Sequence, residues 1–196
     1  MKRCVLIILI FLMAPTIWAA TETIVPDATG TPDDWANFGG ANKVTSVTDA
    51  NDATYIVEVT DEDNQMFPLG NTTFDAGVTV DSFQIVWKHQ DNGSGSNKVQ
   101  LVAFTDASNY CLGANVNLGT GVGTTTDTFL GAPDGANSCG GTLTKAVMDA
   151  LQIRCDATAI GNSREVRVIK IDVIVYYTEA NGEHETARRS RILRGK

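Results

Sequence analysis

Apolar and polar residues alternate most regularly near the C-terminal end of the chain, over residues 164 to 179. In "REVRVIKIDVIVYYTE" apolar residues recur at every second position, and Lys170 and Asp172 occupy the opposite phase. A period of two predicts a β-strand that packs one face on a core and keeps the other in contact with water. The residues expected on the buried face are Ile169, Ile171, Val173, Val175 and Tyr177.

A hairpin is predicted in the middle of the chain. The pattern of "VTVDSFQIVWKHQ", residues 78 to 90, changes phase near Asp81 and Ser82. A β-bulge there would bring the valines at its start onto the same face as the large apolar residues from 83 to 87. The turn-forming stretch "DNGSGS" follows and leads into "NKVQLVAFTD", residues 97 to 106, which we expect to pair with the first strand.

Four more elements complete the pattern. "ALQIRCDAT", residues 150 to 158, is expected to pair with the strand at 164 to 179 across the turn "AIGNS". "NKVTSVTD" (42 to 49) and "ATYIVEVTD" (53 to 61) predict two further strands. "TLTKAVMDAL" (142 to 151) predicts a helix of about two turns.

Six or more short strands separated by turns predict an all-β fold. Together with 18 glycines and no repeated helical pattern, they favour an antiparallel β-sandwich of the jelly-roll kind with at most one short helix. One long segment, residues 112 to 141, is rich in Gly, Thr and Asn. Loops of this length are usually binding loops or disordered segments, so we expect functional variation here.

The order of these features resembles a known group of modules. Trp35 in an N-terminal segment, the turn leading into "DATYIVEV", a central hairpin, and "LQIRCDA" followed by "REVRVIKIDVIVYYTE" are similar to jelly-roll modules of secreted bacterial and virion surface proteins. The resemblance covers residues 32 to 179. It implies a protein that binds or assembles rather than one that catalyses a reaction.

The first twenty residues, "MKRCVLIILIFLMAPTIWAA", have the layout of a secretory signal peptide. Two basic residues precede a short apolar run from Val5 to Met13, and small residues end the segment. Cleavage is expected after Ala19 or Ala20, and Cys4 lies before the apolar run, which excludes a lipoprotein cysteine. No later segment reaches the roughly 20 apolar residues of a spanning helix. We therefore expect a β-sandwich domain over 21 to 180, without a transmembrane segment, and a tail over 181 to 196.

Charge is divided unevenly between the domain and the tail. The whole chain has 15 basic and 23 acidic residues. The leader removes two of the basic ones, and five more lie in "ARRSRILRGK" at the C-terminus, so eight remain in the body. Such an acidic body repels phosphate backbones, and nucleic acid is not expected as a partner. The basic residues that could contact an anionic cell surface or the acidic body of another copy are Arg188, Arg189, Arg191 and Arg194.

Three cysteines remain without the leader, and their spacing matches no zinc pattern. In an oxidising compartment they predict one disulfide and one unpaired thiol. Cys111 with Cys139 is favoured because it would join the ends of the long Gly-rich segment. Cys111 with Cys155 remains the alternative, since connectivity cannot be read from sequence.

Acidic residues and histidines are the candidates for metal binding and catalysis. Asp49, Asp61 and Asp63 lie in two acidic turns and could supply oxygen ligands to calcium, although the EF-hand pattern is absent. No other cofactor is expected. His89 and His184 are interpreted as surface residues, and the G-x-S-x-G motif of serine hydrolases is missing. An enzyme is therefore not expected.

Aromatic residues give the better binding hypothesis. Sugar rings present C–H faces that pack on aromatic rings, and neighbouring polar side chains hold their hydroxyls. Trp87 alternates with core residues and is expected inside the fold, whereas Trp35 lies in a polar loop. Trp35, Tyr55 and Tyr110 are the candidate ligand-binding residues.

Two functional hypotheses follow. The first is an exported structural or adhesive β-sandwich that self-assembles on or outside the cell. The alternative is a carbohydrate-binding module with a structural calcium ion.

Overall fold

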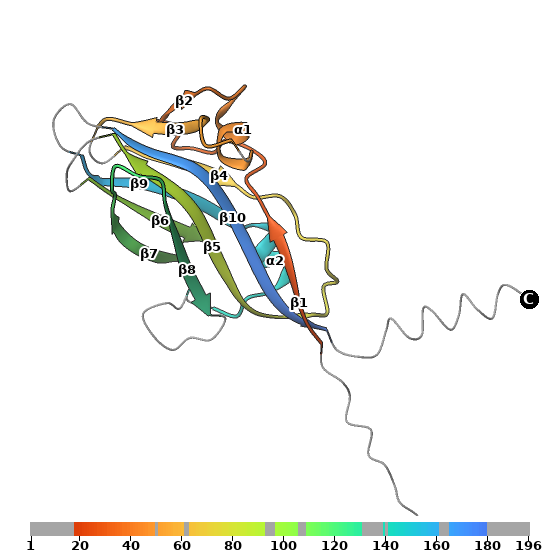
Figure 1. Ribbon diagram of the computed structural model, residues 1–196. Coiled ribbons are helices and arrows are strands. Elements are labelled where there is room, and N and C mark those ends of the chain that lie inside the picture. Colours follow the sequence, from red (N-terminus) through yellow and green to blue (C-terminus); the bar gives the residue numbers. More distant parts are fainter. Residues whose placement is uncertain are drawn as a thin grey trace, which may run out of the picture.

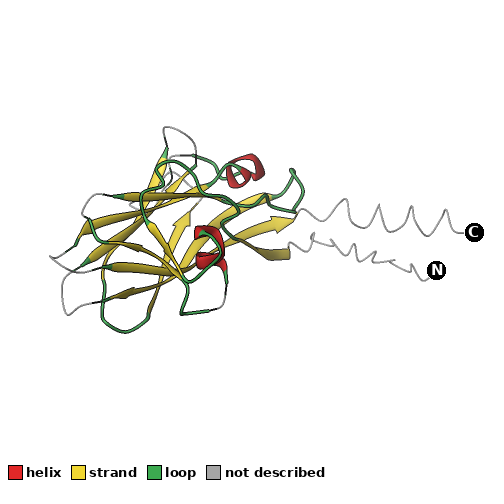
Figure 2. Ribbon diagram, turned by 90° about the horizontal axis from the view of Figure 1, so that it is seen from above, coloured by secondary structure: helices red, strands yellow, loops and turns green. Residues whose placement is uncertain are grey.

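The computed structural model describes residues 18–49, 51–60, 63–92, 97–105, 109–130, 139, 141–160 and 165–179. Its strands form two antiparallel sheets that pack face to face, and Figures 1 and 2 show the two layers from directions at right angles. The predicted antiparallel β-sandwich is therefore confirmed. No helix among these residues is long and apolar enough to cross a membrane.

The six-stranded sheet has the order β2, β3, β10, β5, β8, and β1 also pairs with β10. The bounds of its strands are β1 (Trp18–Ile24), β2 (Ala36–Phe38), β3 (Tyr55–Glu58), β5 (Thr79–Asp91), β8 (Gly123–Leu130) and β10 (Val166–Glu179). β10 is long enough to pair with β3 near its start and with β1 near its end, while β5 runs along its other side.

The four-stranded sheet has the order β4, β9, β6, β7. Its strands are β4 (Asn64–Pro68), β6 (Lys98–Phe104), β7 (Tyr110–Asn117) and β9 (Gln152–Ala159). β7 and β8 are consecutive in the chain but lie at the edges of different sheets.

Two short helices accompany the sheets, one more than predicted. α2 (Lys145–Asp149) confirms the helix expected at 142 to 151 and begins at the N-cap Thr144. α1 (Lys43–Thr48) replaces the strand expected at 42 to 49, so that prediction is wrong. The physical reason is local, because Asn42 and Thr45 form a reciprocal capping box that satisfies the first backbone N–H groups of a helix.

The predicted bulge in β5 is confirmed. Ser82 pairs with Tyr176 and Val80 with Tyr177, so Asp81 is the extra residue. Val80 and Phe83 are consequently both buried in the core, as the phase change required. A second bulge in β10, which the sequence pattern did not reveal, skips Ile169 and puts Val168 in the core cluster in its place.

Both predicted hairpins are wrong. β5 and β6 belong to different sheets, and so do β9 and β10. β5 pairs with β10 and β8, whereas β6 pairs with β7 and β9. Alternation shows which side chains of a strand are buried, but it carries no information about the neighbouring strand, and a short connection can cross from one sheet to the other.

The core lies between the sheets and includes Trp87, as expected. The start of β1 overlaps the end of the predicted leader, since Trp18, Ala19 and Ala20 pair with Glu179, Thr178 and Tyr177. The rest of the leader lies outside the described residues. Signal-peptide cleavage stays a prediction, and a cut after Ala20 would leave residues 21 to 24 to pair with β10.

Candidate ligand-binding face

The outer face of the four-stranded sheet carries exposed aromatic and apolar side chains. Leu101, Ala103 and Cys111 belong to the core cluster, so their neighbours along β6 and β7 point outward. Phe104 pairs with Tyr110 across the two strands, and Val102 pairs with Leu112. Tyr110 is 54% exposed and Leu112 is 50% exposed.

Tyr110 and Phe104 form an aromatic pair with a cation against it. Their ring centroids lie 5.6 Å apart at an interplanar angle of 38°. The Arg154 guanidinium lies 4.9 Å from the centre of the Phe104 ring. Phe104 is half-buried while Tyr110 is exposed, so the inner ring and the guanidinium support an outer ring that solvent can reach.

Asp156 fixes Arg154 in this position. Arg154 donates from Nε to Oδ1 of Asp156 at 2.5 Å and from Nη2 to Oδ2 at 2.7 Å. The two residues are two apart on β9, so their side chains lie on the same outward face. A bidentate pair of this kind orients the guanidinium and cancels its charge locally.

Polar side chains continue this face. Gln152 is exposed and pairs with Phe104 across the sheet. We call the following set the Tyr110 face: Phe104, Tyr110, Leu112, Gln152, Arg154 and Asp156. It combines exposed ring surface with amide, guanidinium and carboxylate groups on a rigid sheet.

The disulfide Cys111–Cys139 is adjacent to this face. Its Cα atoms lie 4.7 Å apart, which confirms the favoured pairing over the alternative with Cys155. Cys155 is a buried free thiol on β9, and burial, with a smaller contribution from Asp156, raises the pKa of that thiol well above its usual range. The disulfide ties β7 to residue 139 beyond the end of β8.

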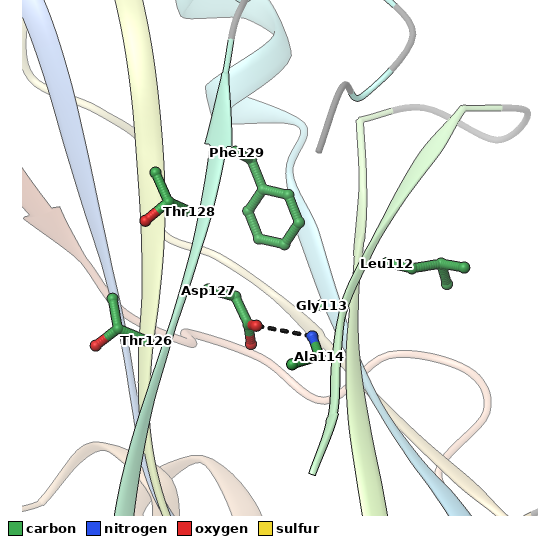
Figure 3. A pocket seen from close by; sticks show the side chains of 7 residues that line it. All are labelled: Leu112, Gly113, Ala114, Thr126, Asp127, Thr128 and Phe129. Atoms are coloured by element: carbon green, nitrogen blue, oxygen red, sulfur yellow. Dashed lines mark hydrogen bonds between the residues drawn. The ribbon is translucent and has the colours of Figure 1, made fainter. Parts of the chain in front are cut away.

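A pocket of about 400 Å³ opens between the edge strands β7 and β8. In Figure 3, Asp127 and Phe129 point from β8 toward β7, and Leu112 points away from the pocket. Asp127 accepts from the Ala114 backbone N–H at 2.7 Å and from Trp87 Nε1 at 3.2 Å. The residues that line the pocket are Leu112, Gly113, Ala114, Thr126, Asp127, Thr128 and Phe129. Because the carboxylate is held by donors from both sheets, it serves to join the sheets.

Glycine is required at position 113 for this contact. A Cβ atom there would lie 2.7 Å from Asp127 Oδ2 and 2.8 Å from the Leu101 carbonyl oxygen. Gly113 therefore permits the close approach of β7 to the buried carboxylate.

The expectation that Trp35 is an exposed platform is wrong. Its side chain is 1% exposed, and its indole N–H donates to the Asp63 carbonyl oxygen at 3.1 Å. The loop that carries it folds back on β4 through a bridge between Asp33 and Gln65. Flanking polar residues made the segment look exposed, but the indole packs into the core cluster.

Tyr55 lies on the other sheet and is largely buried. Its ring stacks on that of Phe38 with a centroid distance of 4.7 Å and an interplanar angle of 13°. Tyr55 is therefore not close to the Tyr110 face. The structure places the two predicted tyrosines on different sheets.

The predicted calcium ligands do not meet as a set in the described part of the chain. The Asp49 carboxylate accepts from Thr54 Oγ1 at 2.7 and 2.8 Å and from the Asn51 N–H at 3.0 Å, and Asp61 lies outside the described residues. Asp63 uses its backbone oxygen to hold Trp35. Among the residues that the structure describes, no group of three or more His, Cys, Asp or Glu side chains could hold a metal ion. Calcium stays a prediction.

His89 is buried, so its interpretation as a surface residue is wrong. Only 6% of it is exposed, its Nε2 lies 2.9 Å from Thr125 Oγ1, and its ring lies against Trp87. Burial lowers the pKa of this imidazole. His184 and the basic tail residues Arg188, Arg189, Arg191 and Arg194 lie outside the described residues, and the hypotheses about them stay predictions.

Sequence reasoning missed Phe104, Gln152, Arg154 and Asp156. A signal was present in "LQIRCDA", where polar residues two apart alternate with core residues. That alternation identified the outward phase of β9, but the contact of Arg154 with a ring on β6 depends on the strand order. The order could not be read from the chain.

No protein-family model and no curated protein matches this sequence. Several solved structures are similar in fold. The CBM36-1 domain of a multidomain xylanase from the hindgut metagenome of Trinervitermes trinervoides has 11% identity and a TM-score of 0.40, over 80% of this chain and 96% of that chain. A mutant of the family 29 carbohydrate-binding module CBM29-2, complexed with mannohexaose, has 13% identity and a TM-score of 0.39, over 80% and 92%. A CBM4 structure has 11% identity and a TM-score of 0.37, over 72% and 94%.

Proposed function

We propose that this chain is an exported, non-catalytic β-sandwich that binds a saccharide chain on the Tyr110 face. The observation that carries the proposal is the exposed Tyr110 ring, which a half-buried Phe104 and an oriented guanidinium support on the outer face of a sheet. An aromatic ring exposed in this way can pack on the C–H face of a sugar.

The neighbouring groups suit hydroxyl recognition. A guanidinium has five N–H donors, and the contacts of Arg154 with Asp156 use two of its nitrogens. The exposed Gln152 amide can both donate and accept. Both carboxylate oxygens of Asp156 accept hydrogen bonds from Arg154, so this carboxylate orients the guanidinium and does not act as an acid or base. The face therefore favours binding over hydrolysis.

Export is supported by the covalent chemistry of the chain. The Cys111–Cys139 disulfide is of the kind that persists in oxidising compartments. The leader-like residues 1 to 20 agree with this location.

The test is a binding measurement on soluble and insoluble polysaccharides. Xylan, galactomannan, mixed-linkage β-glucan and cellulose would be offered to the wild type and to Tyr110→Ala, with retardation in a polysaccharide gel or depletion from solution as the readout. Loss of the ring should weaken binding by about tenfold, which corresponds to about 1.4 kcal/mol. Tyr110→Phe should keep most of the affinity, since the ring face remains.

Leu130→Ala is the matched control. Leu130 is 50% exposed and lies on β8, an edge strand of the six-stranded sheet. It follows the core residue Phe129 and so points outward from that sheet rather than onto the Tyr110 face. Its truncation removes a similar exposed apolar side chain and should leave binding unchanged. Binding to none of the polysaccharides, or equal binding by Tyr110→Ala and wild type, would contradict the proposal.

A further inference from the structure

A second aromatic patch lies on the outer face of the six-stranded sheet. Ile56 and the valines on either side of Arg167 belong to the core, so Tyr55 and Arg167 point outward from β3 and β10. Phe38 pairs with Tyr55 across β2 and β3 and is 55% exposed. We call Phe38, Tyr55, Arg167 and Glu165 the Phe38 patch.

Contacts within the Phe38 patch hold its exposed ring in place. The Phe38 and Tyr55 rings are nearly parallel, 4.7 Å apart between centroids. The Arg167 guanidinium lies 4.5 Å from the centre of the Tyr55 ring. Glu165 accepts from Arg167 Nε at 2.7 Å and from Nη2 as well. Directly after Phe38, Gly39 adopts a φ of +78°, which turns the chain at the end of β2.

The Phe38 patch repeats the chemistry of the Tyr110 face. Each has an exposed ring, an inner ring against it, and an arginine on the inner ring. In each, a carboxylate two residues from the arginine orients the guanidinium, Asp156 for Arg154 and Glu165 for Arg167. In both patches the charge of the arginine is compensated by its paired carboxylate. The body of the chain is acidic. This chemistry fits a neutral saccharide better than an acidic one.

The two patches face in opposite directions. One lies on the outer face of the four-stranded sheet and the other on the outer face of the six-stranded sheet, with the core between them. Figure 1 shows β2 and β3 at the top of the view and β6 and β7 below them. A saccharide chain that lies along one outer face does not run along the other.

We propose that the Phe38 patch is a second binding site for neutral saccharides, so that a single copy bridges two saccharide chains. This inference rests on the proposed function of the Tyr110 face. It assigns an adhesive role to the monomer itself, without association between copies.

The test is a bridging assay. A neutral polysaccharide (mixed-linkage β-glucan, xylan or galactomannan) is immobilised, protein is added and washed, and a fluorescent soluble form of the same polysaccharide is then captured. Bound protein is measured separately by antibody. Light scattering reports whether the protein is monomeric at the working concentration.

Phe38→Ala and Tyr110→Ala should each still bind the immobilised polysaccharide through the remaining patch, although more weakly than the wild type. Each should capture at least fivefold less of the soluble form. The double variant should lose both binding and capture. Leu130→Ala should match the wild type in both readouts. Uronic-acid polysaccharides such as alginate should be captured less than neutral ones.

Each other result overturns a defined part of the inference. Unchanged capture by Phe38→Ala removes the second site and leaves the proposed function intact. Loss of all binding in Phe38→Ala, with none lost in Tyr110→Ala, removes the Tyr110 face and the bridging together. Capture by an oligomer alone removes single-copy bridging. A wild type that binds none of the polysaccharides overturns both proposals.

Discussion

The side of the sandwich at β7 and β8 and the two outer faces use the same kinds of side chain in different ways. On this side, Asp127 of β8 and His89 of the adjacent strand β5 are buried and contact groups inside the fold. On the outer faces, Asp156 and Glu165 hold arginines against the inner ring of each aromatic pair. The inner rings in turn support the exposed rings of Tyr110 and Phe38. The comparison indicates that buried polar pairs contribute stability, while the outer pairs orient a surface for binding.

Loss of the buried carboxylate should have the largest effect on stability. Asp127→Ala leaves the Trp87 indole N–H and the Ala114 backbone N–H without their acceptor inside the protein. We expect the free energy of unfolding to fall by about 2 to 4 kcal/mol, as measured by urea denaturation.

Asp127→Asn is the matched control, since one acceptor oxygen remains and the loss should be smaller. Saccharide binding by either folded variant should be unchanged. If Asp127→Ala were as stable as the wild type, the buried pair would not be a source of stability and the comparison would fail.

Removal of the disulfide should have an effect on stability of similar size. Replacing both Cys111 and Cys139 by Ser removes the covalent link between two residues that are 28 positions apart in the chain. The unfolded chain then gains conformational freedom. The expected decrease in unfolding free energy is about 2 to 4 kcal/mol. Reduction of the wild type by dithiothreitol should shift the denaturation midpoint in the same direction, and an unchanged midpoint in both cases would refute the prediction.

His89 should make stability depend on pH. Burial lowers the pKa of its imidazole from the ordinary value of 6.5, so the unfolded chain binds a proton at higher pH than the folded one. The stability is therefore greatest above pH 6.5 and decreases as the pH falls below it. Thermal unfolding from pH 8 to pH 5 measures this, and His89→Gln should reduce the slope. Parallel curves for the two proteins would exclude a contribution from His89.

The outer arginines should have the smallest effect on stability and a clear effect on binding. In Arg154→Lys the bidentate contact with Asp156 is lost, but the side chain is partly exposed. We expect unfolding free energy to change by no more than about 0.5 kcal/mol, while polysaccharide binding falls several-fold. A large loss of stability without loss of binding would place Arg154 with the buried pairs.

The sequence predicted the sandwich because burial leaves a period of two in each strand. It also located the bulge at Asp81, since the change of phase had to be absorbed somewhere. It did not predict which strands pair, and the two hairpins were wrong for that reason. Strand order depends on contacts between distant segments, which a single sequence does not reveal.

The same limit explains the outcome for the site residues. Tyr110 was identified as a candidate by its chemistry, but its partners Phe104 and Arg154 come from β6 and β9. Trp35 was misplaced because its immediate neighbours are polar, although its indole reaches the core and the Asp63 carbonyl. Exposure depends on what folds over a segment as well as on what flanks it.

Cys155 provides a reporter that needs no engineering. In the chain without residues 1 to 20, and with Cys111 and Cys139 joined, it is the remaining thiol. Its side chain is fully buried in β9, and its raised pKa keeps the sulfur protonated in the folded state. A protonated thiol does not react with thiol reagents. A thiol reagent should therefore modify Cys155 only in molecules that have opened, so the rate of labelling reads out how often the sandwich comes apart.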